Sequence, residues 1–168
     1  MTNKRKITKE VLIAILLAVC LLFGVAVVIL AEKFVGKPIF YNGEMSNIRI
    51  RISEVCSSNS SLIAADTGEF FDYIELYNYG ETINLSGFGL SNDSNNSIAY
   101  KFGDIEFKGN SYMIVFLDGK KVPFRLNAGG NEYLALVTWD GTVVDSLTTV
   151  KKGSNEVMLL EGNTYSVT

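Results

Sequence analysis

Apolar and polar residues follow two different patterns along this chain of 168 residues. From Val11 to Ala31 the sequence VLIAILLAVCLLFGVAVVILA runs for 21 residues without a charge. As a helix with about 1.5 Å of rise per residue, this run spans about 31 Å, close to the thickness of the hydrocarbon core of a bilayer. From Ile48 onward, apolar and polar residues alternate with a period of two, which is typical of strands with one buried face.

The apolar run predicts an uncleaved, single-pass transmembrane helix over residues 11–31. A cleaved secretory signal has an apolar region of about 7–15 residues that ends in small residues. Here the run is longer, and the bulky Ile29 stands two residues before Ala31, where a small residue is needed. A lipoprotein signal is disfavoured as well, because Val19, which precedes Cys20, is not small.

Charge predicts the orientation of this helix in the cell membrane. Four basic residues precede it: Lys4, Arg5, Lys6 and Lys9. The positive-inside rule then places residues 1–10 in the cytoplasm, as a basic tail, and the chain after the helix outside the cell. Residues 1–31 carry a net charge of +3 and the whole chain −3, which leaves −6 for residues 32–168.

An acidic ectodomain is a poor partner for nucleic acid, because phosphate contacts need clustered Lys and Arg. The isolated pairs Lys120-Lys121 and Lys151-Lys152 are expected in solvated turns. We therefore expect the lipid bilayer as one partner and no nucleic acid.

Two parts follow the predicted helix. Residues 32–47, EKFVGKPIFYNGEMSN, mix glycine, proline, charges and aromatics, and we expect them to form a stalk. Residues 48–168 form the predicted domain, in which residues 70–93 read as a strand, a turn and a second strand. The candidate strands are IRIRISEV (48–55), DYIELYN (72–78), SIAYKF (97–102), DIEF (104–107), SYMIVFL (111–117), EYLALVTW (132–139), TVVDSLTT (142–149) and NEVMLL (155–160).

Turn signals separate these segments: Tyr79-Gly80, Asp118-Gly119, Gly129-Gly130, Asp140-Gly141 and Gly162-Asn163. The Asp140-Gly141 pair suits the positive φ angles of a tight hairpin turn. No stretch after Ala31 shows helical periodicity. Short strands with frequent turns predict an all-β fold, a single antiparallel β-sandwich over residues 48–168.

The two cysteines cannot pair within one chain, because Cys20 lies in the predicted span and Cys56 in the predicted domain. The domain must then be stabilised by its core rather than by a disulfide. We interpret Cys56 as a small residue at the end of a strand. An intermolecular disulfide and a reactive thiol remain open alternatives for it.

The chain contains no histidine, which bears directly on catalysis. Its absence removes Ser-His-Asp and Cys-His catalysis and histidine-containing zinc sites. It thereby excludes a sortase, which needs a histidine beside its cysteine, and the Ser-Met pair of a type I signal peptidase is missing near the membrane. We expect no enzyme and no cofactor.

Acidic residues between 66 and 75 are the only candidates for a metal site. Asp66, Glu69 and Asp72 could offer oxygen ligands to Ca²⁺ together with Glu75 and Asn59, although their spacing is not that of an EF-hand. The competing interpretation is a solvated acidic loop followed by a strand with one polar face. A glycosidase pair would need a cleft between two carboxylates, of which one loop gives no sign.

Aromatic residues are frequent in the same region. Tyr73 and Tyr77, predicted to face outward, could stack against sugars, although aromatics at alternate strand positions are more often core residues or cross-strand pairs. A carbohydrate-binding or Ca²⁺-binding surface module therefore stays open as an alternative function.

Two segments carry a family resemblance. ISEVCSSN (52–59), followed by an acidic loop and DYIELYNYGETINLSGFGLSND (72–93), resembles the lamin tail domain of bacterial surface proteins. NAGGNEYLALVTWDGTVVDSLT (127–148) is similar to the end of that domain, where a Gly-Gly turn leads into a hairpin closed by Asp-Gly. The residues that carry the resemblance are Glu54, Asn59, Asp72, Ile74, Glu75, Leu76, Asn78, Leu85, Ser86, Gly87, Gly129, Gly130, Asp140, Gly141 and Asp145.

The resemblance implies an immunoglobulin-like β-sandwich that acts as an interaction or attachment module and binds a protein or a cell-envelope component. It implies a core position for Ile74 and Leu76, whereas Asp72, Glu75 and Asn78 would fix the strand and the turn after it. In the family this domain often stands beside a catalytic partner, so the chain is either a stand-alone module or a shortened relative of a longer protein. The loops 57–70 and 92–97 are the expected contact surfaces, since loops on a rigid scaffold usually carry recognition.

Overall fold

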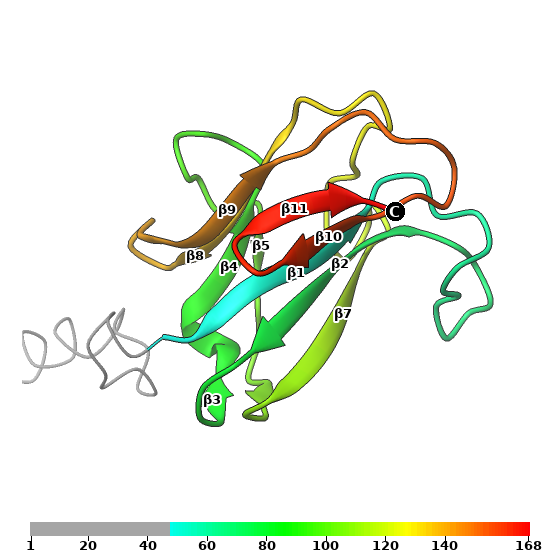
Figure 1. The fold of residues 1–168 in the computed structure, drawn as a ribbon. Helices are drawn as coiled ribbons and strands as arrows, with labels where there is room; N and C mark the ends of the chain where they lie inside the picture. The colour runs from blue at the N-terminus through cyan, green and yellow to red at the C-terminus, as the bar shows by residue number, and fades with distance from the viewer. Residues whose placement is uncertain (1–47) are drawn as a thin grey trace, which may run out of the picture. The chain divides into compact units, whose positions relative to one another are not determined.

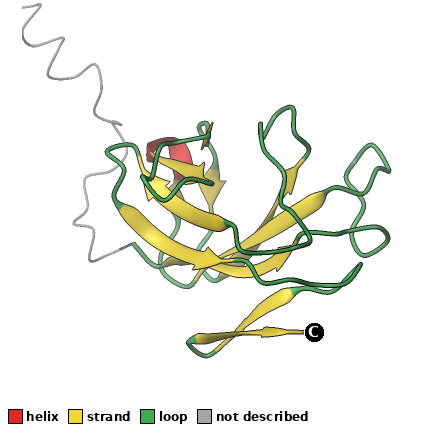
Figure 2. Cartoon of the chain, turned by 90° about the horizontal axis from the view of Figure 1, so that it is seen from above, coloured by secondary structure: helices red, strands yellow, loops and turns green. Residues whose placement is uncertain are grey.

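The computed structural model describes residues 48–168. Its strands are β1 (Ile50–Cys56), β2 (Asp72–Asn78), β3 (Ile83–Asn84), β4 (Phe88–Ser91), β5 (Tyr100–Lys101), β6 (Glu106–Phe107), β7 (Ser111–Leu117), β8 (Tyr133–Thr138), β9 (Val143–Thr148), β10 (Met158–Glu161) and β11 (Thr164–Val167). A single 3-10 turn, η2 (Leu85–Gly87), is the helical element of this part of the chain, red in Figure 2. The expected all-β fold is confirmed.

Two larger sheets make up the domain, and all their strand pairs are antiparallel (Figure 1). The first has five strands in the order β11-β10-β1-β2-β7, and the second has four in the order β5-β4-β8-β9. The short strands β3 and β6 form a separate pair. Consequently β7 and β11 are the edges of the first sheet, and β5 and β9 are the edges of the second.

The main core takes apolar side chains from both sheets. Ile52, Ile74 and Leu76 come from the five-stranded sheet, and Leu90 and Leu136 come from the four-stranded sheet; all five are fully buried. Alternation along each strand sends every second side chain to this core. Burying a leucine or isoleucine side chain contributes about 1.5–3 kcal/mol, so this cluster supplies much of the stability of the domain.

A second, smaller core lies on the other face of the five-stranded sheet. It is built from Cys56, Tyr73 and Val157, and Ile63 of the loop after β1 packs against it. The Tyr73 side chain points away from the main core, as predicted, but it is not exposed to solvent. Only 1% of it is accessible, so the prediction of an outward-facing ring is wrong. The loop supplies a cover that strand alternation alone does not reveal.

The regular alternation of β1 is interrupted by a bulge. The register with β2 shifts between Ile52 and Glu54, so that Ile52 and Val55 both face the main core although three positions separate them. A bulge inserts one residue and leaves part of the ladder unpaired. The extra residue, Ser53, donates its hydroxyl to Glu75 Oε1 at 2.7 Å.

The turn at Asp140-Gly141 differs from the expectation. Gly141 has a φ of +83°, but Asp140 is not among the residues with positive φ. The Thr138 N–H donates to the Thr142 carbonyl and the Gly141 N–H to the Thr138 carbonyl, both at 2.9 Å. The hairpin therefore has a three-residue loop that ends in a left-handed glycine, which needs one positive φ rather than two.

The strand predictions vary in accuracy. β7 has the predicted bounds, whereas the expected strands at 97–102 and 104–107 pair over only two residues each. β3 and β11 were not predicted. The expected tail, transmembrane helix and stalk at residues 1–47 lie outside the described residues. Across residues 48–168 no helix has the length and apolar character needed to cross a membrane.

Candidate functional site

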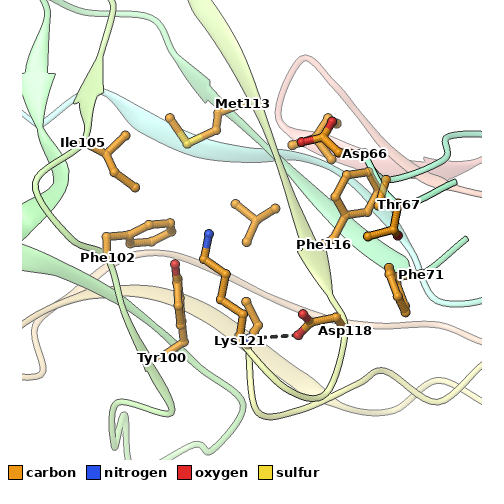
Figure 3. Close-up of a pocket in the computed structure, with 14 residues that line it drawn as sticks. Asp66, Thr67, Phe71, Tyr100, Phe102, Ile105, Met113, Phe116, Asp118 and Lys121 are labelled. Atoms are coloured by element: carbon orange, nitrogen blue, oxygen red, sulfur yellow. Dashed lines mark hydrogen bonds between the residues drawn. The ribbon is translucent and has the colours of Figure 1, made fainter. Parts of the chain in front are cut away.

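A hollow of about 360 Å³ lies beside β7 at the edge of the five-stranded sheet. We call it the edge groove (Figure 3). It is lined by Ala65, Asp66, Thr67, Phe71, Tyr100, Phe102, Ile105, Met113, Ile114, Val115, Phe116, Asp118, Lys121 and Val122. Most of these side chains are apolar, and the segments that carry them are far apart in the sequence.

Four consecutive residues of β7, 113–116, line the edge groove. Val115 and Met113 contact the main core, whereas Ile114 and Phe116 contact the second core on the opposite face. A hollow that reaches both faces of one strand must lie along the edge of that strand, because successive side chains point to opposite faces. Figure 3 shows the lining residues on the two sides of β7.

The two sides of the groove have different origins. On one side, Tyr100 and Phe102 pack edge to face, with ring centroids 5.2 Å apart and an angle of 78° between the rings. On the other side, Phe71 and residues 65–67 come from the loop between β1 and β2. The expected contact loop 57–70 therefore supplies part of one wall.

Three charged residues line the groove. Asp118 accepts backbone hydrogen bonds from Lys120 at 2.9 Å and Val122 at 3.0 Å, and the Lys120 bond is the main cause that lowers the pKa of this carboxyl. Its carboxylate thus holds its own turn together. The side chain of Lys121 projects into the hollow between Tyr100 and Met113 (Figure 3). Asp66 is exposed on the opposite side.

A second hollow, of about 340 Å³, involves the other expected contact loop. Asn92, Asp93 and Ser94 line it together with Arg125 and Glu132. The Asp93 carboxylate accepts a hydrogen bond from the Asn95 N–H at 3.0 Å, which is the main cause that lowers the pKa of Asp93. This hollow is polar, and the Asp93 carboxylate is already hydrogen-bonded within its own loop.

The candidate calcium ligands are not gathered into one site. Asp66 and Glu69 are exposed, and Glu69 accepts a hydrogen bond from the Thr67 hydroxyl at 3.1 Å. Asp72 accepts the Leu126 N–H at 3.3 Å, and burial raises the pKa of its carboxyl. Within residues 48–168 no three His, Cys, Asp or Glu side chains come together as metal ligands would.

The environment of Cys56 differs from that of a reactive thiol. The residue is fully buried, and its Sγ lies 3.7 Å from the Glu156 carbonyl oxygen. Burial raises the pKa of the thiol, and such a cysteine is inert. An intermolecular disulfide would require an exposure that this position lacks.

Three tyrosine rings, the half-buried Tyr77 and the exposed Tyr79 and Tyr112, gather on the outer face of β2 and β7. Tyr77 stacks on Tyr112 with ring centroids 4.4 Å apart, and Tyr79 lies 6.2 Å from Tyr77. The Arg51 guanidinium stands 4.7 Å above the centre of the Tyr79 ring, and Arg49 is 6.0 Å from it. We call these five residues the tyrosine patch. Tyr112 is 61% exposed and offers a free ring face.

Glu54 and Asn59 carry part of the family resemblance, and both bond to neighbouring structure. Glu54 accepts the hydroxyl hydrogen of Tyr73. The Asn59 amide donates to the carbonyls of Ile63 at 2.7 Å and Phe71 at 2.8 Å, which closes the loop after β1.

The side chain of Asn78 makes four hydrogen bonds. Its amide donates to the carbonyls of Glu81, Phe107 and Lys108 at 2.7, 3.1 and 3.1 Å, and its Oδ1 accepts the Gly80 N–H at 3.0 Å. Only 1% of the residue is exposed. It therefore joins the turn after β2 to the segment between β6 and β7.

Several other resemblance residues lie in turns and in η2, whereas Asp145 lies in β9. Leu85 is buried. The side chain of Asn84 caps η2, because its Oδ1 accepts the Ser86 N–H at 2.8 Å. The buried Ser86 hydroxyl has no hydrogen-bond partner among the described residues.

Gly130 has a φ of +72° where its backbone crowds Val150 and Lys151. Gly87 is buried, Asp140 bonds to the Thr138 hydroxyl at 2.5 Å, and Gly129 bonds to Asn127.

Sequence reasoning missed the roles of two polar residues, the buried Lys152 and the half-buried Tyr165. Lys152, expected in a solvated turn, is only 6% exposed, and its Nζ donates to the Val55 carbonyl at 2.6 Å. Burial lowers its pKa. The Tyr165 hydroxyl donates to the Ile52 carbonyl at 2.6 Å, and burial raises the pKa of this tyrosine. Neither role has a local signal, because each depends on strands distant in the sequence.

A comparison of the chain with protein-family models, with curated proteins and with solved structures finds no match.

Proposed function

We propose that residues 48–168 form a non-catalytic binding module that a transmembrane helix at residues 11–31 holds outside the cell. The module has the immunoglobulin-like arrangement of a lamin tail domain and contacts a protein or a component of the cell envelope. The edge groove is the observation that carries this proposal. Concave, mostly apolar hollows with a few polar groups are the usual form of a binding site.

The chemistry of the described residues supports binding rather than catalysis. Strongly shifted pKa values mark catalytic groups, but they also arise in structural networks. Here burial is the main cause of the shifted pKa values of Asp72, Asp145 and Lys152. Each of the three bonds to the backbone of a distant segment, which is the role of a structural group. The full chain also lacks histidine, the commonest general base.

Photo-crosslinking in intact cells tests the proposal. A photoreactive phenylalanine analogue replaces Phe71, in the edge groove, or Trp139, an exposed aromatic at the β8–β9 turn. The expected result is an adduct of defined mass from position 71 and none from position 139. Equal adducts from both positions, or no adduct from position 71, would contradict the proposal.

Glycan binding is a second candidate function, and the tyrosine patch favours it. The exposed ring of Tyr112, held flat by its stack on Tyr77, is a platform on which a sugar ring can lie. A glycan array tests this candidate with the wild-type chain and Tyr112→Ala. Retention of a glycan by the wild type and its loss in the variant would support it, and an array without signal would reject it.

A further inference from the structure

The four edges of the two larger sheets differ in how well they are protected. β5 has two residues and β11 has four, and short edge strands offer little to pair with. β9 has six residues, but its register with β8 shifts between Leu136 and Val137, and it carries Asp145. Bulges and inward-pointing charges are devices that protect sheet edges.

β7 has none of these devices. It is seven residues long and pairs with β2 over seven consecutive positions without a register shift. Its sequence, SYMIVFL, contains no charge and no proline. A long, regular, uncharged edge presents unpaired N–H and C=O groups on which another strand can form.

We infer that the edge groove binds an extended peptide that adds a strand alongside β7. This inference rests on the proposed function and names the class of its partner. The hollow lies where an added strand would run, because it follows residues 113–116 and reaches both faces of β7. Main-chain hydrogen bonds then supply affinity, and pockets for alternate side chains supply specificity.

The walls of the groove favour a single peptide strand over a second folded copy of the chain. Residues 65–67 and Phe71 rise on one side of β7, and Tyr100, Phe102 and Ile105 rise on the other (Figure 3). The edge is thereby recessed. A slim extended segment fits between such walls, whereas a whole second domain would have to bring its own edge past them.

The lining predicts the side chains of the peptide. On the inner side, alternate residues of the peptide would meet Met113, Phe102 and Ile105, so they are apolar. On the outer side they would meet Phe116 and Phe71, so they are apolar or aromatic.

Lys121 predicts one acidic residue in the peptide. Its ammonium group points into the hollow, toward Phe102 and Met113. The carboxylate of the nearby Asp118 accepts backbone N–H groups of its own turn instead. A lysine held against apolar surface is stabilised by an opposite charge. An aspartate or glutamate on the inner face of the peptide supplies that charge.

The test selects a displayed library of random peptides on the full chain in detergent. A synthetic copy of an enriched peptide is then studied by hydrogen–deuterium exchange and by fluorescence anisotropy. We expect enriched peptides to alternate apolar residues around one acid and to slow exchange in β7. Peptide methylated at alternate backbone nitrogens keeps its side chains but loses strand pairing, and we expect its binding to fall at least tenfold.

Lys121→Glu is the matched variant, because the residue is exposed and its replacement leaves the core intact. We expect this variant to bind the acidic peptide more weakly and to bind a version with lysine in place of the acid more tightly. The inference is overturned if no peptide is enriched, if β7 is not protected, or if the methylated peptide binds equally well. A chain that dimerises through β7 would also overturn it. A position-71 adduct without β7 protection would leave the proposed function intact.

Discussion

The carboxylate of Asp145 on β9 accepts a hydrogen bond from the backbone N–H of Ile52 on β1 at 2.7 Å. This bond connects the two sheets at the bulge of β1, where the ladder to β2 is interrupted. The Ile52 carbonyl, in turn, accepts the hydroxyl of Tyr165 on β11. The N–H and the carbonyl of Ile52 are therefore both hydrogen-bonded to side chains, as buried backbone groups require.

The buried carboxyls predict that the domain is more stable in mild acid than at neutral pH. Burial raises the folded-state pKa of both Asp145 and Asp72. Their contribution is then fully present below the unfolded pKa of about 3.9 and is lost as the pH rises through the folded value. The free energy of unfolding, measured with urea, should rise as the pH falls from about 7 to about 4.

Asp145→Asn separates this effect from other titrations. The variant keeps an oxygen that can accept the Ile52 N–H but has no charge to bury, so its stability should depend less on pH. The lowered pKa values of Asp93, Asp118 and Asp140 have the opposite effect, but their contribution is lost only as the pH falls through about 5 and below, so it affects only the acid end of this window. If the free energy of unfolding of the variant changes with pH as steeply as that of the wild type, Asp145 is not the cause of the pH dependence.

Gly130 should be irreplaceable, whereas its neighbour Gly129 should not. A methyl group on Gly130 would lie 2.3 Å from the Lys151 nitrogen, and its φ of +72° disfavours any side chain. Gly130→Ala should therefore lower the free energy of unfolding by more than about 2 kcal/mol. Gly129→Ala meets only the side chain of Asn127 and should cost less than about 1 kcal/mol. Equal losses of the free energy of unfolding in the two variants, measured by chemical denaturation, would refute this distinction.

Asn78→Ala should be strongly destabilising. Three carbonyls would lose their donor in a buried site, and each unsatisfied group costs about 1–3 kcal/mol unless water reaches it. Asn163→Ala, in the exposed β10–β11 turn, is the matched control and should change stability by less than about 0.5 kcal/mol. A small loss for Asn78→Ala would mean that the turn after β2 does not depend on this amide.

Glu75 should act on stability rather than on a separate activity. Its carboxylate accepts the Ser53 hydroxyl at the bulge, and this bond is worth about 1 kcal/mol, or about 4 °C in melting temperature. Glu75→Ala should lower the melting temperature of the ectodomain, and Glu75→Gln, which keeps an acceptor, should lower it less. A Glu75→Ala variant that melts like the wild type would rule out the structural role.

Local patterns predict most of the longer strands, and non-local contacts explain what the patterns miss. Ile74 and Leu76 follow from alternation, because the faces of a strand are set by its own sequence. The burial of Tyr73 and Lys152 depends on a loop and on strands far along the chain, so alternation and charge could not predict it. The edge groove was not predictable either, since it depends on the strand order that leaves β7 at an edge.

A displayed binding module requires that residues 48–168 lie outside the cell. Asn163→Cys places a thiol in the exposed turn between β10 and β11, whereas the native Cys56 is buried. A membrane-impermeant maleimide applied to intact cells should label this variant and leave the wild type unlabelled. Labelling of the variant only after the cells are opened would place the domain inside and contradict the proposal of a displayed binding module.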